Sequence, residues 1–383
     1  MKRVLYITQK PHHPILDGGT QAIASFFLML RRCKDIELTY APICTVKHPG
    51  DFSRIEHSIK LIPLRINPKV TFQVLLKSIS APMNVLRYTT SNANSVIQSV
   101  DSATKFDIVI CDGFYALTLI PSTWFTSKRV IYRSHNLEYE HWQQRSASGP
   151  WYTRWFFKRM SRQIHRLEQN LVSASSQILS ISFQETLKLR QWNSKTSTYY
   201  PLIHSKEKQA LPRLEKLSIG FVGNFEWFPN ADAVRWFVQS IWPLILAEIP
   251  QVQLEIAGRG SETFNMPSAN IHGLGFVKSL DEFYNRQTVM ISPLRYGTGL
   301  NMKILEALTY GKPIVTTAKS IQGFEHTTPF VIANDPSTFA ERIVNLLNNK
   351  QDIRTIELEI SEYINTIFEE NKLLNQLEQH IHG

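Results

Sequence analysis

The chain has 383 residues, with 43% hydrophobic and 11% aromatic side chains and a formal net charge of +10. This length accommodates two domains with separate cores, and no apolar run approaches the about 20 residues that a membrane-spanning helix needs. Cys33, Cys44 and Cys111 are too few and too scattered for a disulfide framework or a zinc site, which favours a reducing cytoplasm and no structural metal.

The positive charge is unevenly distributed along the chain. Residues 1–210 contain 28 Lys and Arg against 13 Asp and Glu, whereas the remainder contains 14 against 19. A basic half of this kind is compatible with an anionic membrane surface, an acidic acceptor or nucleic acid. Because no zinc finger, basic zipper or RNA-recognition signature is present, we do not expect a nucleic-acid partner.

Strand and helix patterns alternate through residues 1–205, which predicts an α/β domain. The first strand, residues 3–8, leaves no room for a signal peptide, and a helix is expected from about Gln21 to Arg32. Residues 68–101 read as mostly helical. Further strands are expected at Ile36–Val46, Ile59–Ile66, Phe106–Cys111, Arg129–Arg133, Gln177–Ser182 and near Ser197–Tyr200.

Two features of this half lie where parallel strands end, the usual place for ligands in α/β sheets. Gly18 and Gly19 follow the first strand and offer a close backbone approach, although a glycine pair is also an ordinary turn. His135 follows the strand at Arg129–Arg133, and a buried structural histidine is the alternative to a functional one.

Residues 141–170 are rich in Trp, Phe, Arg and Lys, including Trp142, Trp151 and Trp155. An amphipathic helix lying on a membrane has this composition. A helix that packs its aromatic side chains inward and exposes a basic face has it too, and is the commoner outcome.

We place an interdomain linker at residues 206–215, because Ser205–Glu215 is polar, contains a proline and lacks an apolar period. A second α/β domain is expected over residues 216–365, and a C-terminal helix over residues 366–383, packing back towards the first domain. The strands of this second domain are expected at Leu217–Gly223, Val252–Gly260 (a strand and turn), Ile271–Phe276 (a short strand with a turn), Val289–Pro293, Ile314–Val315 and Phe330–Ile332. Helices are expected at about Ala231–Ala247, Leu280–Gln287 and Asn301–Tyr310, and between 336 and 382.

The most informative stretch runs from Arg295 to Val315. It passes from a buried strand through a Gly-Thr-Gly turn, Gly297 to Gly299, into a helix that Gly311 and Pro313 end. Free amides and the positive helix end meet at such a turn, which suits a phosphate. Lys303 and Glu306 share one face of this helix, so the turn has the groups that a nucleotide diphosphate needs. An ordinary strand–loop–helix unit with solvated charges is the alternative.

With these motifs in order, the chain resembles glycosyltransferase family 4, retaining enzymes of the GT-B fold. The resemblance covers most of the chain. Its residues are Gly18-Gly19, Arg133–Glu138, Phe221–Asn230, Ala257–Gly260 and Gly297–Val315. It implies an α/β protein with two Rossmann-like domains facing across a cleft, and a hexosyltransferase that acts in polysaccharide or glycoconjugate biosynthesis.

The resemblance also implies roles for individual residues. Glu306 matches the glutamate that holds the nucleotide ribose, Lys303 the cation at the leaving phosphate, and His135 the histidine near the transferred sugar; these are the expected catalytic residues. The other residues expected to bind substrate are Gly18, Gly19, Gly223, Asn224, Arg259, Phe276, Arg295, Gly297, Thr298, Gly299, Leu300 and Asn301.

One residue departs from the family pattern. The family often has two glutamates seven residues apart, and Thr298 occupies the position of the first. A hydroxyl can hydrogen-bond to a sugar, but it cannot offer a negative charge to an oxocarbenium-like centre. The sugar and the details of catalysis therefore stay open.

The sequence thus predicts transfer of a sugar from a nucleotide-diphosphate sugar to a saccharide, lipid-linked or protein acceptor, with retention. No Asp-x-Asp signature is present, so we expect neither metal nor cofactor, with Lys303, an arginine and the helix end stabilising the leaving phosphate. We expect a cytoplasmic protein that could work at the inner face of the membrane. A nucleotide-sugar epimerase of the same fold, a non-catalytic nucleotide-sugar-binding protein and a peripheral membrane scaffold remain as alternatives.

Overall fold

The computed structural model describes residues 1–383 apart from residues 16, 90–92, 149, 202–216 and 326–328. The expected linker at residues 206–215 therefore lies outside the described residues. The chain divides into two compact units. The first comprises Met1–Leu202, Thr298–Leu300 and Glu370–Gly383, and the second comprises Ile203–Gly297 and Asn301–Glu369.

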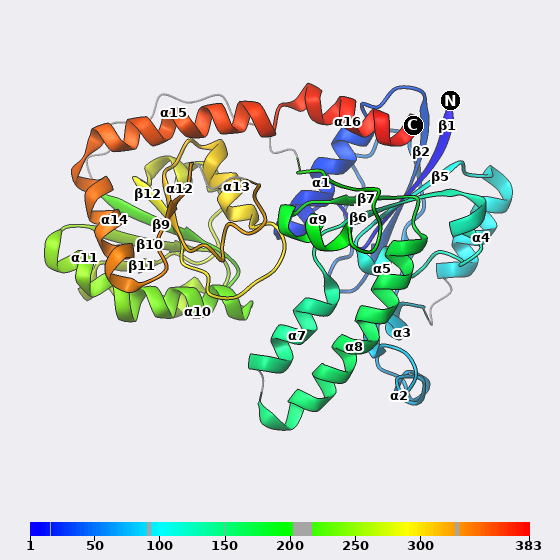
Figure 1. The fold of residues 1–383 in the computed structure, drawn as a ribbon, viewed down its shortest axis with the longest axis horizontal. Helices are drawn as coiled ribbons and strands as arrows, with labels where there is room; N and C mark the ends of the chain where they lie inside the picture. Colours follow the sequence, from blue (N-terminus) through cyan, green and yellow to red (C-terminus); the bar gives the residue numbers. More distant parts are fainter. Residues whose placement is uncertain (16, 90–92, 149, 202–216, 326–328) are drawn as a thin grey trace. The chain divides into compact units, whose positions relative to one another are not determined.

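The first unit is built on a parallel sheet with helices on both faces (Figure 1). The strand order is β3-β2-β1-β5-β6-β7-β8, and β4 also pairs with β2. The strands are β1 (Lys2–Thr8), β2 (Ile36–Cys44), β3 (Lys60–Leu61), β4 (Leu64–Arg65), β5 (Ile108–Asp112), β6 (Arg129–Ser134), β7 (Gln177–Ser180) and β8 (Thr196–Thr198). The helices are α1 (Gly18–Leu30), α2 (Phe72–Lys77), α3 (Met83–Thr89), α4 (Ala93–Thr104), α5 (Phe114–Leu117), α6 (Trp124–Ser127), α7 (Glu138–Ser148), α8 (Trp151–Ala174), α9 (Phe183–Leu189) and α16 (Glu370–His382).

The central strand β1 is apolar on both faces because helices cover both sides of a parallel sheet. Successive side chains of a strand point to opposite faces. Leu5 and Ile7 accordingly pack in one cluster, which includes residues of α4 and α5, while Val4 and Tyr6 pack in another. The second cluster contains residues of α1 together with Leu373, Leu377 and Ile381 of α16. The last helix of the chain thus completes the core of the first unit.

Two elements of this unit differ from the sequence prediction. The expected strand Ile59–Ile66 is wrong as one element: β3 and β4 each pair with β2 separately. Pro63 lies between them, and proline has no N–H to donate to a ladder. Helix α1 begins at Gly18 rather than near Gln21, because Asp17 accepts a hydrogen bond from the Thr20 backbone N–H at 2.8 Å and caps the helix three residues earlier.

The second unit contains a smaller parallel sheet in the order β11-β10-β9-β12-β13-β14 (Figure 1). Its strands are β9 (Ser218–Val222), β10 (Gln253–Ala257), β11 (Ile271–Gly273), β12 (Val289–Ser292), β13 (Ile314–Thr316) and β14 (Val331–Ile332). Its helices are α10 (Phe228–Trp236), α11 (Trp242–Glu248), α12 (Leu280–Arg286), α13 (Met302–Thr309), α14 (Pro336–Asn348) and α15 (Lys350–Ile367). One apolar cluster, from Ile219 of β9 to Leu347 of α14, forms the core.

The helix expected at Ala231–Ala247 is interrupted in the structure. A π-helical turn, Phe237–Ile241, separates α10 from α11. Pro243 follows this turn and cannot donate to the carbonyl of Gln239, so the helix widens there. In the part of the chain that the structure describes, no helix combines the length and the apolar character needed to cross a bilayer.

Candidate active site

In each sheet the strands that follow the first strand are added first on one side of it and later on the other, which creates a topological switch point. In the first unit β1 lies between β2 and β5, and in the second β9 lies between β10 and β12. Ligands of open α/β sheets bind outside the carboxyl ends of the strands at such switch points. Most candidate residues of both units lie just after the carboxyl end of a strand or at the start of the helix that follows one.

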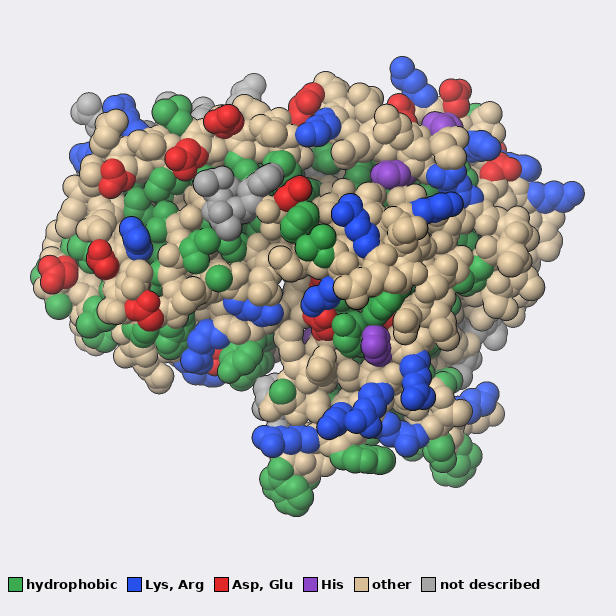
Figure 2. Space-filling model, in the orientation of Figure 1, with side chains coloured by type: hydrophobic (Ala, Val, Ile, Leu, Met, Phe, Trp, Pro, Cys, Tyr) green, Lys and Arg blue, Asp and Glu red, His purple; other side chains and the backbone are tan. Residues whose placement is uncertain are grey.

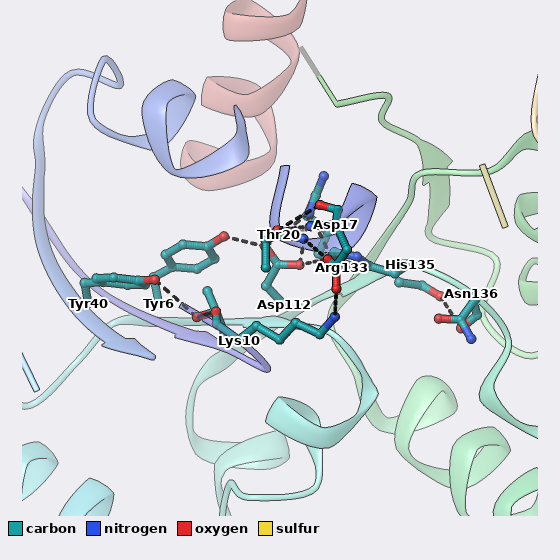
Figure 3. Close-up of polar contacts among 11 residues, drawn as sticks. Tyr6, Lys10, Asp17, Thr20, Tyr40, Asp112, Arg133, His135 and Asn136 are labelled. Atoms are coloured by element: carbon teal, nitrogen blue, oxygen red, sulfur yellow. Dashed lines mark hydrogen bonds and ion pairs between the residues drawn. The ribbon is translucent and has the colours of Figure 1, made fainter. Parts of the chain in front are cut away.

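In the first unit, a buried polar network surrounds Asp112, the last residue of β5 (Figure 3). Arg133 Nη1 donates to Oδ1 and Oδ2 of Asp112 at 3.0 and 3.1 Å, and His135 Nε2 contacts Oδ1. The hydroxyl of Tyr6, on β1, donates to Oδ2. Parallel pairing causes this assembly, because β5 and β6 place Asp112 directly beside Arg133.

The network fixes the ionisation of Asp112. Burial alone would raise the pKa of this carboxyl, but the Arg133 guanidinium and His135 outweigh it and hold the pKa at about 2. For His135, burial lowers the pKa, and the Asp112 carboxylate opposes that effect only in part. The imidazole is therefore neutral near neutral pH.

The charge of Asp112 also decides the tautomer of His135. An ionised carboxylate only accepts hydrogen bonds, so the contact with Asp112 requires a proton on Nε2 of the histidine. In the neutral ring, Nδ1 then carries the lone pair and can accept a proton or a hydrogen bond. His135 is thus a buried histidine with a defined tautomer at the end of β6.

Gly18 and Gly19 lie in the first turn of α1, not in a loop ahead of it. Asp17 caps this turn, and Lys10 Nζ contacts Asp17 Oδ2 at 2.6 Å (Figure 3). Burial would raise the pKa of Asp17, but Lys10 lowers it below its ordinary value. The glycines therefore lie at the start of a helix, and Asp17 already pairs with Lys10 and caps that helix.

In the second unit, glycines let two strand ends approach closely. A Cβ on Gly258, whose φ is +119°, would lie 1.9 Å from the carbonyl oxygen of Gly223. A Cβ on Gly223 would lie 2.8 Å from Nδ2 of Asn230. That Nδ2 donates to the carbonyl of Asn224 at 2.8 Å. The loop after β9 is therefore folded tightly over the loop after β10.

Lys303 points from the first turn of α13 towards this loop. Its Nζ donates to Oδ1 of Asn230 at 2.5 Å and lies 4.4 Å from the ring centroid of Phe221. Burial lowers the pKa of Lys303 to about 7, and Glu306 opposes this shift only in part. The ammonium group is held between an amide oxygen and an aromatic face, so an anion that arrived there would favour its charged form.

Glu306, one turn further along α13, accepts a hydrogen bond at 3.0 Å from the hydroxyl of Tyr284 on α12. Tyr284 stacks on Tyr310 with 4.6 Å between ring centroids, and the Tyr310 hydroxyl is hydrogen-bonded to Asp281. The carboxylate of Glu306 is thus held by a fully buried tyrosine, which fixes its direction.

The turn between β12 and α13 has the backbone that its glycines predicted. Gly297 and Gly299 adopt φ values of +131° and +77°, which side chains rarely tolerate. Thr298 lies between them, and Leu300 precedes Asn301, the N-cap residue of α13. Asn301 Nδ2 donates to Ser292 Oγ at 3.0 Å, which ties the start of the helix to the end of β12.

The two candidate arginines are paired with carboxylates. Arg295 Nε and Nη2 donate to Asp232 at 3.0 and 2.6 Å, and Arg259 Nη1 lies 3.8 Å from Glu226. Since Asp232 offsets much of the charge of Arg295, Lys303 is the better-placed cation. Phe276 follows β11 and is 76% exposed.

Among the described residues, no group of three or more His, Cys, Asp or Glu side chains is placed to hold a metal ion. The buried, hydrogen-bonded polar groups at the candidate site are instead those around Asp112 and those around Lys303.

A family model described as "Glycosyl transferases group 1" matches residues 216–349. An uncharacterized 44.6 kDa protein in the cps region of Klebsiella pneumoniae is 21% identical over 305 residues, which cover 74% of this chain and 76% of that protein.

Solved structures match the whole fold. Anabaena HepE in complex with UDP-glucose is 14% identical, with a TM-score of 0.66 over 100% of this chain and 99% of that chain. A variant of S. aureus TarM with bound UDP is 10% identical, with a TM-score of 0.69 over 100% of both chains. WaaG, described as a glycosyltransferase involved in lipopolysaccharide biosynthesis, is 13% identical, with a TM-score of 0.63 over 99% of this chain and 100% of that chain.

The matches to solved structures show that this chain has the GT-B fold.

The structure also brings together several residues that the sequence did not indicate. Asp112 contacts His135 and accepts a hydrogen bond from Tyr6. Asn230 contacts Lys303, and Tyr284 contacts Glu306. The position of Asp112 at a strand end was an available signal, because the strand Phe106–Cys111 was predicted to end one residue before it. No comparable signal in the sequence marks Tyr284.

Proposed function

We propose that this protein transfers a sugar from a nucleoside diphosphate sugar to an acceptor hydroxyl, with retention of the anomeric configuration and without a metal ion. The observation that carries the proposal is the arrangement on α13, where Lys303 and Glu306 project from a helix start that follows a Gly-Thr-Gly turn. This arrangement lies in the segment that matches the group 1 glycosyltransferase model.

In this reaction the second unit would have to stabilise the leaving nucleoside diphosphate. When the bond between the sugar and the phosphate breaks, negative charge develops on the nucleoside diphosphate, and fixed donors stabilise it. The amides at the start of α13 and the ammonium of Lys303 would supply them. Glu306, directed by Tyr284, would accept hydrogen bonds from the ribose hydroxyls.

In the mechanism that we propose, retention arises because the acceptor attacks from the face that the phosphate leaves. In this mechanism the bond from C1 to the phosphate oxygen breaks, and a bond from C1 to the acceptor oxygen forms. The acceptor proton passes to the leaving phosphate. His135 would position or polarise the sugar or the acceptor through Nδ1. It would do so from a ring that Asp112 fixes.

The substrate class follows from the chemistry of the similar proteins. HepE was solved with UDP-glucose, a TarM variant with UDP, and WaaG is described as acting in lipopolysaccharide biosynthesis. We therefore propose a uridine diphosphate sugar as donor and a glycan, lipid-linked or protein-bound, as acceptor. A lipid-linked acceptor would require work at a membrane surface, and the positive charge of residues 1–210 is compatible with an anionic one.

Incubation with UDP sugars and a set of saccharide acceptors, followed by NMR of the product, tests the proposal. An axial donor linkage should give an axial product linkage, and EDTA should leave the rate unchanged. An inverted product would contradict retention, and a strict requirement for Mg²⁺ or Mn²⁺ would contradict metal independence. An epimerised free sugar, without transfer, would identify an epimerase.

A further inference from the structure

We propose that the outer surface formed by α2, the residues that flank it and the exposed face of α8 from Trp151 to Arg166 docks onto an anionic lipid bilayer. This inference goes beyond the transfer reaction and does not depend on it. We call this region the basic aromatic surface. Its apolar members are Val70, Phe72, Leu75, Leu76 and Ile79 around α2 and Trp151, Tyr152, Trp155 and Phe156 on α8, and its basic members are Arg154, Lys158, Arg162 and Arg166.

The apolar side chains gather here to an unusual degree. Of the 24 large hydrophobic side chains that are exposed among the described residues, these nine belong to the basic aromatic surface. Trp151 and Trp155 are 81% and 71% exposed, and Phe72 and Ile79 are 75% and 71% exposed. Scattered exposed apolar residues are normal, but a contiguous group indicates a contact surface.

The two segments are adjacent in the fold of the first unit. Gln163 Nε2, on α8, lies 3.3 Å from the carbonyl oxygens of both Ser78 and Ile79, which follow α2. Arg159, also on α8, donates to the carbonyl of Ile79. The apolar side chains of α2 and α8 therefore belong to one surface.

The inner side of α8 is already occupied. Met160 and Ile164 are buried in a cluster with Phe114 and Val85. Helices α7 and α8 form a helical hairpin. Within it, Phe157 of α8 packs on Trp142 of α7 with 5.8 Å between ring centroids. Part of the aromatic content of α7 and α8 thus packs inward, as the commoner alternative predicted, but Trp151 and Trp155 do not.

Positive charge runs beside the exposed aromatic side chains. Arg154, Lys158, Arg162 and Arg166 are spaced four residues apart and are all exposed, so they form one row along α8. Figure 2 shows Lys and Arg side chains gathered over this hairpin, with hydrophobic side chains at its outer edge.

Acidic residues are absent from both segments of the sequence. Neither residues 57–100 nor residues 141–167 contain an Asp or a Glu. A helix that places Trp and Phe beside Lys and Arg suits the headgroup region of an anionic bilayer. The charge complementarity therefore favours a bilayer as the occupant.

Flotation of the full chain with lipid vesicles, without nucleotide, tests this proposal. We expect binding to vesicles of phosphatidylcholine mixed with phosphatidylglycerol, and weak binding to phosphatidylcholine alone. Binding should fall as the salt concentration rises towards about 1 M, where the Debye length is about 3 Å.

Two variants separate the contributions. Arg154→Gln with Arg162→Gln should weaken binding about fivefold for each arginine removed, and Trp151→Ser with Trp155→Ser should weaken it about tenfold or more. All four side chains are exposed, so we expect both variants to fold. The matched controls are Arg342→Gln with Arg354→Gln and Leu358→Ser, which alter exposed side chains of α14 and α15 and should bind as the wild type does.

The proposal is overturned if anionic vesicles do not float the wild-type chain, or if the surface variants bind as well as the controls. It is also overturned if the tryptophan variant converts an oligomer to a monomer while vesicle binding is absent, since the surface would then join copies of this chain. Donor turnover is measured separately with soluble substrates, where the tryptophan variant should match the wild type, so failure of docking and failure of the proposed transfer reaction are distinguishable.

Discussion

His135 Nε2 is hydrogen-bonded to Oδ1 of Asp112, and Asp112 is completely buried. Asp112 is the last residue of β5 and His135 directly follows β6, and the register that pairs Asp112 with Arg133 brings the two together. Because the arginine beside it keeps Asp112 ionised, the carboxylate acts as a fixed acceptor that sets the tautomer and the orientation of the imidazole. Asp112 is therefore a positioning residue for His135.

Substitution of Asp112 by asparagine should lower kcat about a hundredfold while the KM for the donor changes little, because a misplaced ring loses the reacting geometry. The Asp112 carboxylate raises the pKa of His135 against the effect of burial, so its removal should also move the ring's titration to lower pH. NMR titration of His135 measures that shift.

The matched control is Asp107→Asn, which alters an exposed carboxylate paired with Arg3 in the same unit. It should leave both kcat and the His135 titration unchanged. An Asp112→Asn variant with lower kcat but an unaltered His135 titration would show that Asp112 stabilises the fold without acting through the histidine.

Binding of a nucleoside diphosphate should be coupled to proton uptake by Lys303. Burial lowers the pKa of the free side chain to about 7, so above that pH it is mostly neutral. The bound diphosphate favours the ammonium form and raises the pKa, so binding takes up a proton and affinity falls as pH rises above about 7.

Calorimetry of UDP binding in buffers with different ionisation enthalpies counts these protons. The Lys303→Met variant should bind without the uptake. Uptake that persists in this variant would assign the titrating group elsewhere. In the unliganded protein the same lowered pKa predicts that stability increases from about pH 7 towards the ordinary lysine value of 10.5, since the unfolded chain then binds more protons.

Tyr284 should contribute to donor affinity chiefly through Glu306, since its hydroxyl is closer to the Glu306 carboxylate (3.0 Å) than to the Lys303 carbonyl oxygen (3.4 Å). Tyr284→Phe removes one hydrogen bond to a charged group and should weaken UDP-sugar binding about tenfold, whereas Glu306→Ala should abolish it. Tyr152→Phe, which alters an exposed tyrosine of the other unit, is the control for calorimetry. If Tyr284→Phe bound donor as tightly as the wild type, Glu306 would not depend on Tyr284 for its orientation.

The C-terminal helix α16 should stabilise the first unit. Leu377 is completely buried among residues that include Phe26 and Tyr199. Its replacement by alanine should cost about 2–5 kcal/mol of unfolding free energy, whereas Leu358→Ala, at a position that is 72% exposed, should cost less than about 0.5 kcal/mol. Urea unfolding followed by tryptophan fluorescence compares the two, and equal midpoints would contradict the packing of α16.

The local features of the fold were predictable because they depend on residues close together in the sequence. The turn at Gly297 and Gly299, with the helix that Gly311 ends, follows from glycine conformation and the apolar period. The π-helical turn before Pro243 and the separation of β3 from β4 at Pro63 follow from one missing N–H each. The sequence contains both prolines, but it did not indicate that they would interrupt the expected helix and the expected strand, because that outcome depends on packing.

The polar network around His135 was not predictable in the same way. Asp112 and His135 are 23 residues apart, and only the pairing of β5 with β6 brings them together. Tyr284 likewise meets Glu306 because α12 packs beside α13, a contact without a sequence pattern. The sequence could therefore indicate His135, Lys303 and Glu306 as candidates, but not the groups that orient them.

The most direct test of the proposed transfer is nucleotide release from a panel of UDP sugars and other nucleoside diphosphate sugars, with a glycan acceptor present. We predict that the wild-type protein releases nucleoside diphosphate from at least one donor as a glycosylated product forms, and that Lys303→Ala and Glu306→Ala lose both activities. Donor binding without release or product from any donor, or release that both variants retain, would contradict the assignment of a glycosyltransferase site to α13.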